Sequence, residues 1–128
     1  HGWDATILAT VKGTPMSVVY GNDVIRGEGL ASAAFMDAEI VRRLGYFVPR
    51  GAIHLYLDDF WMAVGRGLGK LIYLDHVIIE HLHPISGKVE WDAGYVEVNS
   101  QAVYDFDREV FTKWMESESE SELEKLRG

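Results

Sequence analysis

One short apolar run, which ends in polar residues, constrains the fold more than any other feature of the chain. Met16 to Tyr20 is apolar and partly β-branched, and Gly21, Asn22 and Asp23 follow it directly. This is the pattern of a buried strand that delivers polar side chains at its carboxyl end, the edge at which α/β sheets bind ligands. The sequence therefore predicts an α/β protein in which Asn22 and Asp23 border a site.

Helical and strand-like patterns alternate along the rest of the chain. We predict helices over 4–12, 34–44 and from 58 or 59 to 64, and a long amphipathic helix over 101–125. A strand or extended segment is expected over 53–57, and two strands, or one bent strand, over 71–74 and 77–82. Loops are expected over 26–33 and 85–99. The inner face of the long helix is expected to carry Val103, Phe106, Val110, Phe111 and Trp114.

Length and charge narrow the class of protein. The 128 residues fit one domain, and we divide them into a domain over 1–115 and an acidic tail over 116–128 that is helical or frayed. The net charge of -8 argues against nucleic acid as a partner, because phosphate binding needs a basic face. The absence of cysteine excludes disulfides and is compatible with a cytoplasmic location. No apolar run approaches the roughly 20 residues that span a bilayer, so we expect no membrane segment.

Three polar clusters interrupt the apolar stretches: Asn22-Asp23, Asp58-Asp59, and Glu80 to His83. On a strand, His81 and His83 point the same way and can share a ligand. A carboxylate pair at a helix start can hold a divalent cation or take a proton from a hydroxyl. Each cluster also has a simpler interpretation, as a turn, as a helix cap with a first-turn acid, or as surface histidines.

Three longer motifs resemble those of a known family and occur in the same order. The stretch from Phe35 to Phe47 resembles a helix that ends in glycine and an aromatic residue, and Leu57-Asp58-Asp59-Phe60-Trp61 then resembles an acidic Asp-Asp motif. The stretch from Gly69 to His81 resembles the strand, turn and strand that end in histidine. Over roughly residues 2–107, these motifs resemble the family-2-like glycosyltransferases of GT-A type, and are most similar to phage and bacterial glycosyltransferase-like proteins.

The resemblance implies a fold and a set of site residues. It implies the C-terminal portion of a GT-A fold, with a mixed sheet flanked by helices and a long C-terminal helix; the family's nucleotide-binding βαβ half would precede it. It makes Asp59 the first choice for the general base, with Asp58 orienting the acceptor or exchanging roles with it. The remaining residues that it implicates are His81 or His83 as a ligand of Mn²⁺ or Mg²⁺, and Asn22, Asp23, Trp61 and Lys88 as substrate contacts.

The expected function follows from the same resemblance. In the complete protein, a hexose-type sugar would pass from a nucleoside-diphosphate donor to a hydroxyl acceptor, whereas this chain alone would be inactive and would bind metal weakly or not at all. Two alternatives remain open. The chain is a non-catalytic module that self-associates into a homo-oligomer through exposed apolar surface, or it is a metal-dependent hydrolase built on Asp58, Asp59, His81 and His83.

Overall fold

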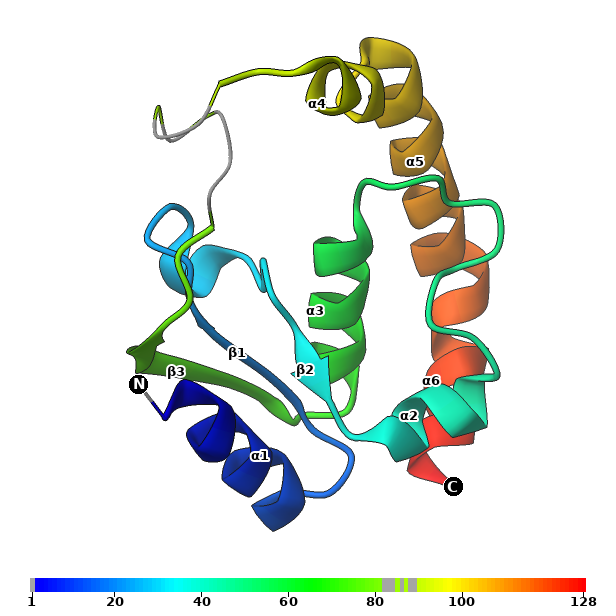
Figure 1. Cartoon of the computed structure of the whole chain (residues 1–128). Coiled ribbons are helices and arrows are strands. Elements are labelled where there is room, and N and C mark those ends of the chain that lie inside the picture. Colours follow the sequence, from blue (N-terminus) through cyan, green and yellow to red (C-terminus); the bar gives the residue numbers. More distant parts are fainter. Residues whose placement is uncertain (1, 82–84, 86, 88–89) are drawn as a thin grey trace.

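The protein has a mixed α/β architecture, with a small sheet, helices on its faces and a long C-terminal helical segment (Figure 1). The computed structural model describes residues 2–81, 85, 87 and 90–128. Its sheet has 3 strands in the order β2-β1-β3, with β1 at Val18–Asn22, β2 at Phe35–Met36 and β3 at Leu71–Ile78. The central strand β1 is antiparallel to β2 and parallel to β3, so the carboxyl ends of β1 and β3 meet at one edge.

An irregularity in the β1–β3 pairing shapes that edge. Gly21 pairs with Leu74 but the next residue, Asn22, pairs with Ile78, so β3 is one strand with a bend, as one of the predicted alternatives allowed. A Cβ on Gly21 would lie 2.6 Å from the carbonyl oxygen of Val77, which explains why glycine stands here. Beyond the bend the pairing continues, and the backbone N–H of His81 donates to the carbonyl oxygen of Asp23 at 3.2 Å. The bend therefore brings His81 beside Asp23.

Helices cover both faces of the sheet (Figure 1). Helix α1 spans Trp3–Gly13 and helix α3 spans Leu57–Gly67, and both contact β1 and β3. Val18 of β1 belongs to the main core cluster together with residues of α3, including Phe60 and Val64. Because side chains alternate along a strand, Tyr20 faces the same side, where it packs with Met62. The carboxyl end of β1 and the first turns of α3 are thus held in a fixed relation.

Helix α2, at Ala38–Leu44, begins later than predicted. Asp37 is its N-cap, and its carboxylate accepts hydrogen bonds from the backbone N–H groups of Glu39 and Met16, at 3.0 and 2.8 Å. The expected helical start was wrong because Phe35 and Met36 pair with β1 as strand β2. The predicted stop is confirmed, since Gly45 is the C-cap with a φ of 81°.

The C-terminal segment is helical over nearly its whole length. Helix α4 spans Ala93–Val98, within the predicted loop, and helix α5 spans Gln101–Lys113. A π-helical turn at Trp114–Glu118 leads into helix α6 at Ser119–Arg127, so the acidic tail is helical. Its Leu123 and Leu126 are buried in the main core cluster.

Two local expectations were wrong. Residues 53–57 form no strand, since a turn precedes α3, whose N-cap is Tyr56 rather than Asp58 or Asp59. On α5, Phe106 is 47% exposed, while Asp107 is 1% exposed and lies on the inner face. In the described part of the chain, no helix is long and apolar enough to cross a membrane.

Candidate functional site

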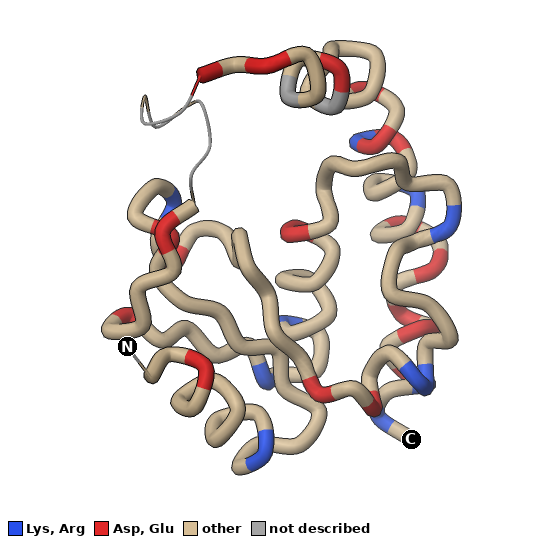
Figure 2. Tube along the Cα trace, in the orientation of Figure 1, with Lys and Arg blue, Asp and Glu red and all other residues tan. Residues whose placement is uncertain are grey.

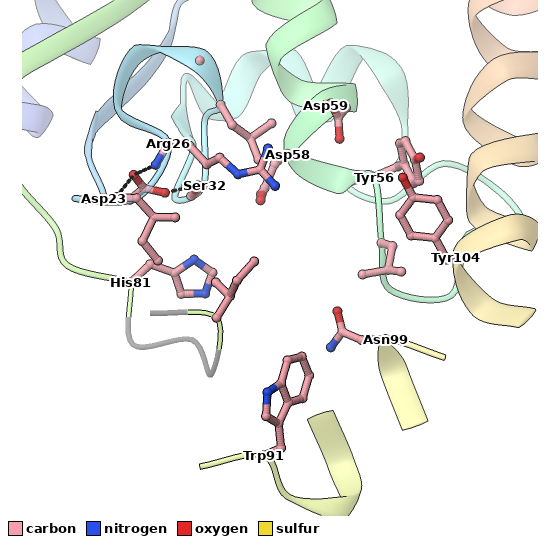
Figure 3. Close-up of a pocket in the computed structure, with 15 residues that line it drawn as sticks. Asp23, Arg26, Ser32, Tyr56, Asp58, Asp59, His81, Trp91, Asn99 and Tyr104 are labelled. Carbon is pink, nitrogen blue, oxygen red and sulfur yellow. Dashed lines mark hydrogen bonds between the residues drawn. The ribbon is translucent and has the colours of Figure 1, made fainter. Parts of the chain in front are cut away.

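A pocket of about 530 Å³ lies at the carboxyl ends of β1 and β3. Its walls come from four parts of the chain: the loop after β1, the turn and first residues of α3, the segment after β3, and residues that lead into or begin α5. Figure 3 shows Asp23, Arg26 and Ser32 at one side of the pocket, Asp58 and Asp59 above it, His81 below, and Tyr56, Tyr104, Asn99 and Trp91 across from them. This placement agrees with the general rule that open α/β sheets bind ligands at this edge.

Asp23 organises the loop after β1. One carboxylate oxygen accepts the backbone N–H groups of Ile25, Arg26 and Gly27 at 2.7–2.9 Å, and the other accepts the hydroxyl of Ser32. Burial raises the pKa of Asp23, but these hydrogen bonds together outweigh it and hold the pKa below its ordinary value. Asp23 is 3% exposed, so it is a fixed anion at the wall of the pocket.

Asp58 and Asp59 occupy the first turn of α3, where negative charge is stabilised by the helix N-terminus. Burial, followed by the neighbouring charges of Asp59 and Asp23, raises the pKa of Asp58 to about 7. Burial also raises the pKa of Asp59, although Arg26 and Arg66 oppose that rise. The two carboxyls are therefore unlike, and Asp58 exchanges its proton near neutral pH.

Asp107, which was not predicted as a site residue, holds the segment that precedes this acid pair. Asp107 of α5 accepts three backbone hydrogen bonds, from Ile53, His54 and Leu55, at 2.6–2.8 Å. These residues lead directly into Tyr56 and the first turn of α3. The sequence carried a signal, because the 3.6-residue period places position 107 on the same face as Val103, Val110 and Trp114. An acid on that face needs buried partners.

Aromatic side chains link α5 to the start of α3. Tyr56 has φ 63°, the left-handed conformation, and its ring lies 5.4 Å from that of Tyr104 and 5.7 Å from that of Phe111. Burial, together with a hydrogen bond to Tyr104, raises the pKa of Tyr56 to about 12. Its hydroxyl therefore stays protonated at neutral pH. Through Tyr104, helix α5 also supplies part of the pocket wall.

The structure separates the residues expected at a site into three groups. Asp23, Asp58, Asp59 and His81 line the same pocket. Asn22 is not among its lining residues, and its side chain instead accepts the backbone N–H of Val24 at 2.9 Å. Trp61 is 3% exposed in the main core cluster, so we withdraw the expectation that it contacts substrate. His83 and Lys88 lie outside the described residues.

The metal expectation stays a prediction. Within the residues that the structure describes, no group of three or more His, Asp or Glu side chains is arranged to hold a metal ion. His81 and the pocket carboxylates are nitrogen and oxygen donors, the types that Mn²⁺ binds. A cation held at His81 would therefore need further oxygen ligands from a bound substrate.

Comparisons with known proteins add no assignment. No family model matches the chain, and neither the curated proteins nor the solved structures gave a significant match. The class of protein is therefore defined by the fold and the pocket alone: a mixed α/β protein with unlike paired carboxyls at the carboxyl ends of two parallel strands.

Proposed function

We propose that the chain is the acceptor-side portion of a nucleotide-sugar-dependent glycosyltransferase of GT-A type, which transfers a hexose-type sugar to a hydroxyl group. One observation carries the proposal: Asp58, whose pKa is about 7, shares a pocket with Asp59 and His81. The order of the motifs supports it, because the acidic motif and the histidine that the resemblance assigns to one active site, far apart in sequence, border one pocket.

Asp58 is the better candidate for the general base. A base works best when its pKa lies near the operating pH, since it must be ionised before the reaction and still hold a proton afterwards. Asp58 meets this condition, whereas Arg26 and Arg66 oppose the rise that burial causes in the pKa of Asp59. In this proposal Asp58 takes the proton of the acceptor hydroxyl as the oxygen attacks the anomeric carbon, and the nucleoside diphosphate leaves. Asp59 orients the acceptor, which reverses the order that the resemblance favoured.

The donor's leaving group would lie toward His81 and Arg26. Both residues line the pocket, and Arg26 supplies a permanent positive charge for a phosphate. A Mn²⁺ or Mg²⁺ ion, when bound, neutralises charge on the leaving diphosphate. His81 would hold it by one imidazole nitrogen, and the diphosphate oxygens would complete its ligands.

Calorimetry with nucleotide sugars tests the proposal. UDP-, GDP- and dTDP-sugars are titrated into the chain with and without Mn²⁺, beside His81→Ala, Asp58→Asn and Asp59→Asn variants. Because the resemblance assigns most nucleotide contacts to the βαβ half, we expect only weak Mn²⁺-dependent binding of one donor class, through Arg26 and His81. This binding should be lost in His81→Ala and retained in Asp58→Asn. His76→Ala is the matched control, because His76 is exposed on β3 and does not line the pocket. A folded chain that binds no donor under any condition would contradict the proposal.

A further inference from the structure

Exposed apolar side chains gather at the same pocket as the carboxyls. Four large hydrophobic residues with 37–65% exposure line it: Ile25, Ile85, Trp91 and Tyr104. They come from different parts of the chain, the loop after β1, the segment after β3 and the start of α5, and they converge on this one cavity. A cavity lined by apolar side chains and a few polar groups is typical of a small-molecule site.

The acids of the pocket select against an anionic acceptor, whereas the proposed place of the donor's diphosphate is at Arg26 and His81. Asp23, Asp58 and Asp59 line the pocket together with Arg26, and among the acids Asp23 remains ionised because its pKa is lowered. A phosphate or carboxylate brought close to these groups would be repelled, and the chain as a whole carries a net charge of -8. Figure 2 shows acidic positions both around this region and along the C-terminal helices. A neutral hydroxyl, by contrast, can donate a hydrogen bond to the carboxylate of Asp58 or Asp59.

The apolar and acidic side chains of the pocket together favour an amphipathic ligand. A pyranose ring presents C–H groups on one face and hydroxyls around its edge, so it can pack on an indole ring and donate to carboxylates at the same time. Trp91 and Asp58 lie on different sides of the cavity (Figure 3). The volume of about 530 Å³ falls within the range of roughly 300–1,000 Å³ of small-ligand sites.

We infer that the acceptor is a neutral saccharide, with one ring packed against Trp91 and a hydroxyl directed at Asp58. This inference rests on the proposed transferase function. Phosphorylated sugars, phospholipid headgroups and nucleic acids are excluded as acceptors. The aromatic ring supplies affinity through contact area, and the carboxylates supply orientation. Because this subsite needs only residues of this chain, acceptor binding does not require a bound donor.

Binding without any donor tests the inference. Methyl β-glucoside, lactose and maltose are titrated into the chain by NMR and by Trp fluorescence, with glucose and glucose 6-phosphate as a pair that differs only in the phosphate. A short single-stranded DNA is added as a polyanion. We expect at least one neutral saccharide to bind, and glucose 6-phosphate to bind about tenfold more weakly than glucose.

Variants at two exposed tryptophans locate the effect. Trp91→Leu is expected to weaken saccharide binding about tenfold, and Trp91→Phe to retain most of it, because a ring remains to stack. Trp3→Leu is the matched control, since Trp3 is 43% exposed on α1 and does not line the pocket. Circular dichroism confirms that each variant is folded.

The failure of this inference can be told apart from failure of the proposed function. Tighter binding of glucose 6-phosphate or DNA than of neutral saccharides would overturn the inference, as would saccharide binding that Trp91→Leu leaves unchanged, or no saccharide binding at all. Each of these results would leave donor binding, the test of the transferase function, unaffected. Saccharide binding that depends on Trp91, in a chain that binds no donor, would uphold the saccharide subsite and overturn the transferase.

Discussion

At the scale of single residues, the site is a set of acids that their surroundings make unlike. Asp23 receives hydrogen bonds from its own loop and stays ionised, whereas Asp58 is partly buried beside two other carboxylates and has a pKa of about 7. Environments that push the pKa values of neighbouring carboxyls apart are how one pocket obtains distinct acid and base roles.

The raised pKa of Asp58 predicts a pH dependence of stability. A carboxyl with a pKa of 3.8 unfolded and about 7 folded binds its proton more tightly in the folded state, so its contribution to the free energy of unfolding falls as the pH rises from about 4 to about 7. Asp58→Asn removes this titration. Urea denaturation of both proteins should show the wild type losing stability relative to the variant across that window. A difference that is constant with pH would contradict this.

Replacement of Asp107 is expected to lower the free energy of unfolding more than replacement of its neighbour Asp105 on α5. Asp107→Ala leaves three backbone N–H groups without their acceptor, and we expect it to lower the free energy of unfolding by about 3 kcal/mol or more. Asp105→Ala, which loses exposed contacts with Arg108 and Gln101, should cost less than about 1 kcal/mol. Urea denaturation compares the two. Equal costs would show that Asp107 does not anchor the turn before α3.

The sequence predicted the pocket acids but not every neighbour. Asp23, Asp58, Asp59 and His81 could be found because polar residues after a strand or at a helix start have a defined place. Trp61 could not be placed, because the motif does not say which face of α3 meets the core. The role of Asp107 could not be predicted because its partners, Ile53 to Leu55, are more than 50 residues away in the sequence.

At the scale of elements, glycine permits close packing where the sequence suggested a helix end. We expected the helix to dissolve at Gly65, yet α3 continues to Gly67. A Cβ on Gly65 would lie 3.0 Å from Cβ of Val18 and 2.9 Å from Cδ1 of Leu71, so glycine lets α3 lie directly on β1 and β3. The boundary was therefore set by tertiary packing, which overrides the low helix propensity of glycine.

Gly65→Ala tests this close approach. The added methyl group must displace Val18 and Leu71, and we expect a loss of about 1–3 kcal/mol in the free energy of unfolding. Gly13→Ala is the control, because a Cβ there meets nothing within 4 Å and should change stability by less than about 1 kcal/mol. Thermal or urea unfolding measures the change in stability of both variants. If Gly65→Ala were as well tolerated as Gly13→Ala, α3 would not pack on the sheet as described.

At the scale of the whole molecule, the C-terminal helices hold the layers together. Helix α6 contacts both α2 and α3, and Leu126 is 2% exposed in the core that these helices share with β1. Arg43 of α2 donates to the carbonyl oxygen of Leu126, and Arg127 donates to that of Gly67. The sequence predicted a C-terminal helix. Its many glutamates did not indicate that Leu123 and Leu126 would be buried, because only the folded structure brings these two leucines to the core.

Leu126→Ala measures how much this contact contributes. Truncation of a buried leucine should lower the free energy of unfolding by about 2–5 kcal/mol. Leu8→Ala, at a position that is 54% exposed on α1, should cost less than about 1 kcal/mol. Denaturation followed by tryptophan fluorescence, to which the buried Trp61 and Trp114 contribute, reports both. A small effect of Leu126→Ala would show that α6 is not part of the core.

The most direct test of the account is the titration of Asp58 itself. Carboxyl ¹³C chemical shifts are followed against pH by NMR, and the Asp58→Asn variant identifies the signal. The account predicts a midpoint near pH 7 for Asp58 and a midpoint below 3.8 for Asp23 in the same pocket. A midpoint for Asp58 close to 3.8 would mean that it is an ordinary surface acid, and would contradict its proposed role as the base.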